Sequence, residues 1–190
     1  IRASTNIQLE GVNGENMAIF NENGSVQLYY DNAEKLATTA SGVHLGAGSV
    51  NATLSTESAG TSNLTLGVNA GNSIASGGTY NVVIGDEAGT AITTGDENVF
   101  VGFQSGDALV DGTFNVAIGS NSLTADTKGK KSVAIGTNAL ATQNFTSLTD
   151  TFNTAVGHSA GTAVTTGTHN TFIGGLSGDA TTTGGSNIAL

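Results

Sequence analysis

Hydrophobic and polar residues follow a repeating order along residues 63–190, with a period of about 17 residues. Each unit opens on the pattern Asn-x-x-(Val/Ile/Leu)-Gly, as in "NVAIG" and "SVAIG". Repetition on this scale is typical of solenoid proteins, in which each coil buries its apolar surface against its neighbours. The chain contains eight unit starts, and Ser132 replaces Asn at the fifth of them. The other seven are Asn63, Asn81, Asn98, Asn115, Asn153, Asn170 and Asn187.

The alternation inside each unit predicts a short β-strand with one buried face, because successive side chains of a strand point to opposite sides. Aliphatic residues occupy the first and third positions after most unit starts. We expect these residues to point into the coil and to stack in register on their equivalents one coil away. They include Val116, Ile118, Val133 and Ile135.

The same phase predicts which bulky residues lie outside the coil. Phe100 and Phe172 occupy the second position of their units, and Phe103 occupies the fifth position of its unit. Exposed apolar residues of this size usually mark an interface. We therefore expect these three phenylalanines to form a candidate interface between chains.

Two further columns indicate how neighbouring coils are joined. A glycine stands four residues after the start of every complete unit, and glycine reaches backbone angles that other residues avoid, so this column predicts a corner. Stacked coils would place equivalent Asn side chains about 4.8 Å apart, close enough to form a ladder of amides. We interpret both columns as structural. The corner glycines are Gly67, Gly85, Gly102, Gly119, Gly136, Gly157 and Gly174.

Residues 1–45 lack the 17-residue period and predict a meander of short strands. The turn "NENG" between two apolar runs indicates a hairpin, and strands this thin bury little surface alone. We expect Ile19, Phe20, Leu28 and Tyr30 to need cover from outside the chain. Residues 46–62 are small and polar, and we interpret them as the joint to the solenoid of residues 63–190.

Composition narrows the functional classes. The 190 residues include 28 glycines and no Cys, Pro or Trp, which favours a narrow core of small and β-branched side chains. The formal charge of −10 would repel a polyanion, so we expect no nucleic-acid partner. The chain lacks an apolar run of the ~18 residues that a membrane span needs, so we expect no membrane insertion in this segment. The lysines of "KGKK" are interpreted as an exposed turn.

Candidate catalytic groups are few. Glycoside hydrolysis needs two carboxylates facing each other across a cleft, and the acidic pairs here stand beside the glycine corners, where a solvated turn is the simpler interpretation. A polysaccharide-degrading spike is therefore the weaker alternative, and we expect no enzyme activity and no catalytic residue. The acidic pairs are Asp86–Glu87 and Asp96–Glu97.

The sequence likewise does not favour a metal or a cofactor. His44, His158 and His169 lack the spacing that brings several ligands to one ion. The glycines recur with the solenoid period, which explains them without a nucleotide. Threonines collect late in several units, but the array is broken in others, so an ice-binding face is also a weaker alternative. We expect neither a metal site nor a cofactor.

The repeats resemble those of two families. The stretch "NVAIGSNSLTADTKGKKSVAIGTNAL" resembles the head repeats of trimeric autotransporter adhesins, the YadA-like β-rolls. The units "GTFNVAIGSNSL" and "GTHNTFIGGLSG" resemble more closely the repeats of phage tail fibres. The segment "GENMAIFNENGSVQLYYDNAEKLATTASGV" is similar to strand-rich modules of such fibres. These resemblances imply a homotrimeric fibre on a virion or outside the cell, with a bacterial cell surface as the alternative location.

The sequence therefore predicts an all-β chain, with a strand meander followed by a parallel β-solenoid, intertwined as a homotrimer. The resemblance implies a fibre shaft or spacer that projects a tip for host-receptor binding, without catalysis. Its expected partners are its own copies, other virion or fibre proteins and a host-surface glycan or receptor. A bacterial adhesin head that binds glycan or matrix is the alternative. Because the sequence stops partway through a unit, we expect the solenoid to continue beyond residue 190.

Overall fold

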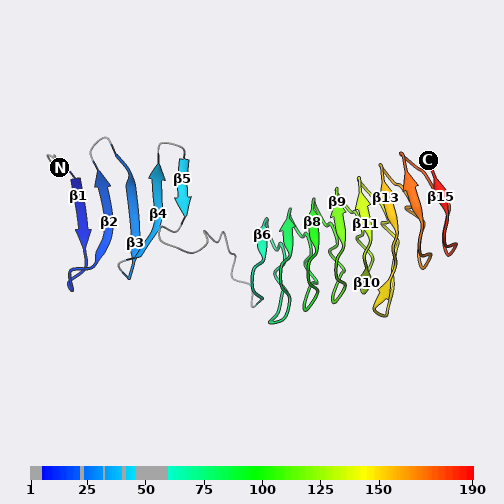
Figure 1. Ribbon diagram of the computed structural model, residues 1–190, viewed down its shortest axis with the longest axis horizontal. Helices are drawn as coiled ribbons and strands as arrows, with labels where there is room; N and C mark the ends of the chain where they lie inside the picture. The colour runs from blue at the N-terminus through cyan, green and yellow to red at the C-terminus, as the bar shows by residue number, and fades with distance from the viewer. Residues whose placement is uncertain (1–5, 22–23, 32, 40–41, 46–59) are drawn as a thin grey trace. The chain divides into compact units, whose positions relative to one another are not determined.

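The computed structural model describes residues 6–21, 24–31, 33–39, 42–45 and 60–190, and all of its regular elements are β-strands. The chain divides into two compact units, Ile1–Leu54 and Ser55–Leu190. The first unit is a five-stranded meander, and Figure 1 shows it as a row of strands and the second unit as a stack of coils. Most of the expected joint, residues 46–59, lies outside the described residues. The predicted all-β fold with a parallel solenoid is confirmed.

The first unit is an antiparallel sheet whose strands follow one another in chain order. Asn21 and Ser25 close the turn between the second and third strands, because the Asn21 backbone N–H donates to the Ser25 carbonyl at 3.1 Å. The five strands are β1 (Asn6–Glu10), β2 (Asn16–Asn21), β3 (Val26–Tyr30), β4 (Ala33–Thr39) and β5 (Gly42–Leu45).

The strand register gives the meander one apolar face. Directly paired residues share a face, and Leu9 pairs with Ala18, Ala18 with Leu28, and Leu28 with Leu36. Leu9 and Leu28 remain about half exposed, although Ala18 between them is buried. Ile19 lies on the opposite face, where it pairs with two glutamines, Gln8 and Gln27. One side of this sheet is therefore apolar and only partly covered.

The second unit contains one three-residue strand in each coil, and these strands form a single parallel sheet. Equivalent residues pair directly, so that Val116 lies between Val99 and Val133. The strands are β6 (Leu64–Leu66), β7 (Val82–Ile84), β8 (Val99–Val101), β9 (Val116–Ile118), β11 (Val133–Ile135), β13 (Thr154–Val156) and β14 (Thr171–Ile173), with the two-residue β15 (Ile188–Ala189) at the end.

The phase predicted for these strands is wrong. The middle residue of each strand points into the coil, and Phe100 and Phe172 are almost completely buried there. The flanking aliphatics face outward, and Ile118 is 38% exposed. The reason is the Asn at each unit start: Asn98 and Asn115 are fully buried, and alternation places the residue two positions later on the same side. Val116, Ile118, Val133 and Ile135 therefore do not form the interior, and Phe100 and Phe172 are not interface residues.

The interior is filled by two columns that compensate each other in volume. Phe100 occupies the second position of its unit, and the eighth position of that unit is Gly106, where an added Cβ would lie 2.6 Å from the Phe100 ring. In the next unit, Ala117 stands at the second position and the buried Leu123 at the eighth. These two coils therefore reach the close packing of a protein interior in two different ways, and four of the seven units that have an eighth position follow one or the other. Phe172 with Gly178 and Ala134 with Leu140 follow the same exchange.

The buried Asn side chains form a hydrogen-bonded ladder along the solenoid. The backbone N–H and the Nδ2 of Asn98 both donate to Oδ1 of Asn81, at 3.0 and 3.1 Å, and Nδ2 also donates to the Gly112 carbonyl at 2.9 Å. Asn115 repeats these bonds to Asn98 one coil later. Each Asn amide therefore bonds to the Asn of the preceding coil and to a backbone carbonyl three residues before the next unit start. The bonded rungs are Asn63–Asn81–Asn98–Asn115 and, after a break, Asn153–Asn170–Asn187.

The corner glycines stand where the backbones of neighbouring coils come closest. Their φ angles lie between +123° and +141°, a region that L-residues rarely adopt. An added Cβ on Gly102 would lie 2.7 Å from the carbonyl carbon of Gly119 in the next coil. Both the backbone angle and the lack of space therefore require glycine at this column.

The ladder is bridged by other side chains where Ser132 replaces Asn. Gln143 donates from Nε2 to Ser132 Oγ at 2.8 Å and accepts from Asn153 Nδ2 at 2.8 Å. The hydroxyls of Ser132 and Thr151 are 2.6 Å apart. A glutamine from the far side of the coil therefore reaches into the gap that the short serine leaves.

Candidate interaction surface

The outward residues of the solenoid sheet form a continuous apolar surface, which we call the apolar strip. It consists of the first and third residues after each unit start. Of these 16 side chains, 14 are aliphatic and two are threonines, although the chain carries 15 acidic residues. The members are Leu64, Leu66, Val82, Ile84, Val99, Val101, Val116, Ile118, Val133, Ile135, Thr154, Val156, Thr171, Ile173, Ile188 and Leu190.

The parallel register makes this strip regular. Val101, Ile118 and Ile135 pair as direct neighbours across three strands, at the usual spacing of about 4.8 Å. Figure 1 shows the strands that carry the strip side by side along the second unit. Most of these side chains are β-branched and therefore restricted at χ1, so the surface that they form has a well-defined shape. Exposed apolar patches of this extent mark a site of interaction.

Two columns of residues border the strip. The leading edge is the residue immediately before each unit start, and the trailing edge is the fifth residue after it. Phe103, the third of the predicted interface phenylalanines, belongs to the trailing edge and is 49% exposed. The leading edge comprises Ser62, Tyr80, Glu97, Phe114, Lys131, Phe152, His169 and Ser186, and the trailing edge comprises Val68, Asp86, Phe103, Ser120, Thr137, His158 and Gly175.

Side chains of the leading edge contact one another along the solenoid. The Lys131 Nζ lies 5.1 Å from the centroid of the Phe152 ring, within the range of a cation–π contact. The His169 ring lies on the next coil, with its centroid 5.1 Å from that of Phe152. Phe152 nevertheless remains 47% exposed. These side chains therefore line the border of the strip without entering the core.

The lysine cluster beside this edge is paired with carboxylates. Lys130 and Lys131 contact Asp150 at 3.0 and 2.7 Å, and Lys128 contacts Asp111 at 3.6 Å. The hydrogen bonds from Lys131 and Lys130 hold the pKa of Asp150 below its usual value. The hydrogen bond from Thr94 is the largest cause that lowers the pKa of Asp111. The predicted exposed turn is therefore only partly correct, because Lys130 lies in a short strand and all three lysines are half-buried and paired with carboxylates.

The unit that starts at Ser132 and precedes Asn153 is 21 residues long, four more than the usual 17, and we call its residues 141–152 the arch. The arch is fastened to Asp126 of the preceding coil. Asp126 lies fully buried at a position where most other units have Ile, Leu or Val. Its Oδ1 accepts the backbone N–H groups of Gly129 and Phe145, each at 3.0 Å. Burial raises the pKa of Asp126 despite these hydrogen bonds. The short parallel pair β10 (Gly129–Lys130) and β12 (Thr149–Asp150) completes the arch.

The acidic pairs bond to neighbouring coils. Asp86 accepts the backbone N–H of Val68 at 3.1 Å, and Asp96 accepts the backbone N–H of Thr79 at 2.7 Å. Glu87 accepts a hydrogen bond from Gln104 Nε2 at 2.6 Å. These carboxylates lie at the turns of the coils and fasten one turn to the next. Glu97, the remaining member, stands on the leading edge.

The histidines stand apart in the fold. His169 lies on the leading edge and His158 on the trailing edge, while the side chain of His44 falls outside the described residues. Among the residues that the structure describes, no group of three or more His, Asp or Glu side chains could hold a metal ion. This finding concerns only the described part of the chain.

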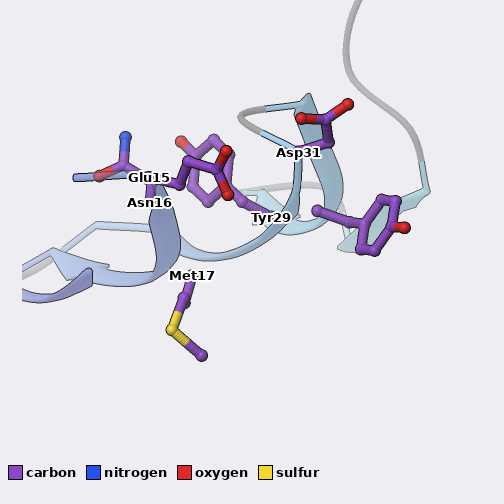
Figure 2. Close-up of a pocket in the computed structure, with 6 residues that line it drawn as sticks. Glu15, Asn16, Met17, Tyr29 and Asp31 are labelled. Carbon is purple, nitrogen blue, oxygen red and sulfur yellow. The ribbon is translucent and has the colours of Figure 1, made fainter. Parts of the chain in front are cut away.

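The meander carries a shallow depression between the start of β2 and the end of β3 (Figure 2). Tyr30 is strongly exposed at its border, and Met17 points away from the other labelled side chains. The depression is open to solvent. It combines two carboxylates, one amide and two phenol rings, whereas typical ligand pockets are lined mainly by hydrophobic side chains. Its lining residues are Glu15, Asn16, Met17, Tyr29, Tyr30 and Asp31.

Comparisons with known proteins add no family. No protein-family model, curated protein or solved structure matches the chain. In the described ranges, no helix is long and apolar enough to cross a membrane. The apolar strip and its two edges are therefore the feature from which a function has to be inferred.

Proposed function

We propose that the chain is a structural segment of a fibre built from three parallel copies of itself. The observation that carries this proposal is the apolar strip: 16 outward positions of one sheet without a single charge. If the chain were a monomer, the outward positions of this sheet would face water and would be expected to carry polar residues. A strip that is apolar in every coil is suited to burial against identical strips.

The meander supports the same assembly. Its face of Leu9, Leu28 and Leu36 is only partly covered within its own sheet. Parallel copies bring equal units together, so the meander of one copy can cover that of the next. An antiparallel pair would instead place the first coils of the two copies, which follow the meanders in the chain, at opposite ends of the paired solenoids. The proposed copies therefore run in the same direction.

The proposed role is mechanical. Backbone hydrogen bonds join each coil to the next, and the Asn ladder reinforces them on either side of Ser132. Several chains side by side would make a stiff spacer. Such a spacer would project a tip that binds a host receptor or surface glycan, with other fibre or virion proteins as its neighbours. The location we propose is a virion appendage such as a tail fibre. Catalysis is not part of this role.

Light scattering on the purified chain tests the assembly. We expect a mass three times the 18.8 kDa of one chain, and we expect this mass to persist on dilution. A stable species of 18.8 kDa would contradict the proposal, because the apolar strip would then be exposed in solution.

A further inference from the structure

The leading edge combines exposure with an unfavourable backbone conformation. Its members have φ angles between +50° and +62°, the left-handed region that bulky residues rarely adopt. Tyr80, Phe114 and Phe152 stand in this region with about half or more of their surface exposed. These rings gain little from burial within their own chain, and they occupy positions where a smaller residue would relieve strain.

A second left-handed corner in the same coils provides the comparison. It lies six residues after each unit start and has φ angles between +53° and +62°. Asn, Gln, Ser and Glu fill six of its seven positions, and Asn in particular tolerates this conformation. Leu176 is the exception. The solenoid therefore contains a column filled mainly with the expected residues and, beside the apolar strip, a column in which three of eight positions are Tyr or Phe.

We propose that the leading edge of one copy packs against the trailing edge of its neighbour, with each coil against the same coil. This inference rests on the proposed fibre, and it names the residues that meet on either side of the strip. The two edges border opposite ends of the same short strands, so copies that bury their strips against each other bring unlike edges together when they run parallel. Antiparallel copies would bring like edges together.

In three coils the two edges pair a long side chain with a short one. Cyclic symmetry about the fibre axis keeps a given coil at the same height in every copy. Phe114 then faces Ser120, and Lys131 faces Thr137, so a long side chain meets a short one. The edge residues of the other coils combine as Ser62 with Val68, Tyr80 with Asp86, Glu97 with Phe103, Phe152 with His158 and His169 with Gly175. No coil brings two charges of the same sign together in this arrangement.

Cysteine cross-linking tests the contact directly, because the natural chain has no cysteine. The variant Phe114→Cys with Ser120→Cys should form disulfide-linked dimers and trimers on mild oxidation, seen on a non-reducing gel. Within one chain the two positions stand at opposite ends of β9, so a link within the chain is not expected. Each single variant serves as the control and should stay unlinked.

The outcomes separate this inference from the proposed fibre. A three-chain mass without links in the double variant would overturn the edge contact while leaving the assembly intact. Links in the single Phe114→Cys variant would show that like edges meet, and therefore that the copies are antiparallel. If the parent chain has the mass of one chain, 18.8 kDa, the proposed fibre assembly itself is contradicted.

A second test replaces the strained aromatic residues of the leading edge by Asn. This change should favour the fold of the single chain but weaken the contact between copies. The triple variant Tyr80→Asn, Phe114→Asn and Phe152→Asn should leave the fold of the coil intact, because Asn suits the left-handed corner. Its assembly should weaken by about tenfold for each ring that carries the contact. Leu176→Asn, at the other left-handed corner, is the matched control and should leave the assembly unchanged. If the triple variant assembles like the parent but loses attachment to host cells, the edge binds a ligand and the proposal is overturned.

Discussion

At the scale of single residues, the fold depends on polar groups placed in an otherwise apolar interior. The Asn side chains satisfy one another and the backbone across successive coils, so their burial carries little penalty. The Asn column was predicted from its period alone, because an amide repeated at strand spacing suggests a ladder. Its consequence for strand phase was missed: a buried Asn at the unit start decides which residues of the strand face inward.

Removing one rung should therefore be costly. Asn98→Ala leaves the Gly112 carbonyl and the donors of Asn115 without their partner. We expect a loss of roughly 1–3 kcal/mol in the free energy of unfolding, the usual cost of a buried polar group left unpaired. Asn72→Ala, at an exposed turn, is the control and should change it by less than about 0.5 kcal/mol. Urea denaturation of both variants gives the comparison, and equal stabilities would contradict the ladder.

Asp126 should give a distinctive dependence on pH. Its pKa is raised above 3.8 in the folded chain, so the folded state binds the proton more tightly than the unfolded state. This group's contribution to stability therefore grows as the pH falls through the raised pKa toward 3.8, and it is lost as the pH rises. Asp111 and Asp150 have lowered pKa values and contribute with the opposite sign.

The variant Asp126→Asn isolates this contribution, because the other carboxylates are the same in both proteins. We expect the stability of the parent relative to the variant to increase as the pH is lowered from neutral to about pH 4. Thermal melting at several pH values measures this difference. Parallel pH profiles for the two proteins would show that Asp126 does not titrate as its burial indicates.

At the scale of the coil, volume compensation links residues that are distant in the repeat. The alternation of Gly and Leu at the eighth position is visible in the sequence, but its partner column could not be recognised while Phe100 was placed outside. Once the buried Asn fixes the phase, Phe with Gly and Ala with Leu become two ways to fill one space. The arch is a different case, because its attachment to Asp126 depends on contacts between coils that spacing does not reveal.

The compensation predicts a strong coupling between Phe100 and Gly106. Phe100→Ala alone should cost about 3–5 kcal/mol, because it leaves a cavity in the core. Gly106→Leu alone should also destabilise, because its Cβ would lie 2.6 Å from the ring. The double variant reproduces the pair Ala117–Leu123 of the next coil and should recover much of the loss. A double-mutant cycle measures the coupling, and additive losses would contradict it.

At the scale of the whole molecule, the sequence allowed the fold class to be predicted but not which side chains of the solenoid sheet face outward. The period, the glycine corners and the hairpin turn were sufficient to infer a meander followed by a parallel solenoid. Hydrophobicity alone suggested that the aliphatic pairs form the interior, because in a monomer they would. Their outward position makes sense if the surface is buried between copies, and a single chain contains no signal for this.

The most direct measurement is the mass and fold of a chain with charges on the apolar strip. Ile118→Asp with Ile135→Asp places two carboxylates among outward aliphatics, whereas Ala117→Asp places one inside the coil. Light scattering with circular dichroism should give a single chain of 18.8 kDa with parent-like β-structure for the outward pair. The inward variant should instead lose its structure, because an unpaired buried charge is strongly unfavourable. An outward pair that assembles like the parent would contradict the role of the strip as the interface between copies.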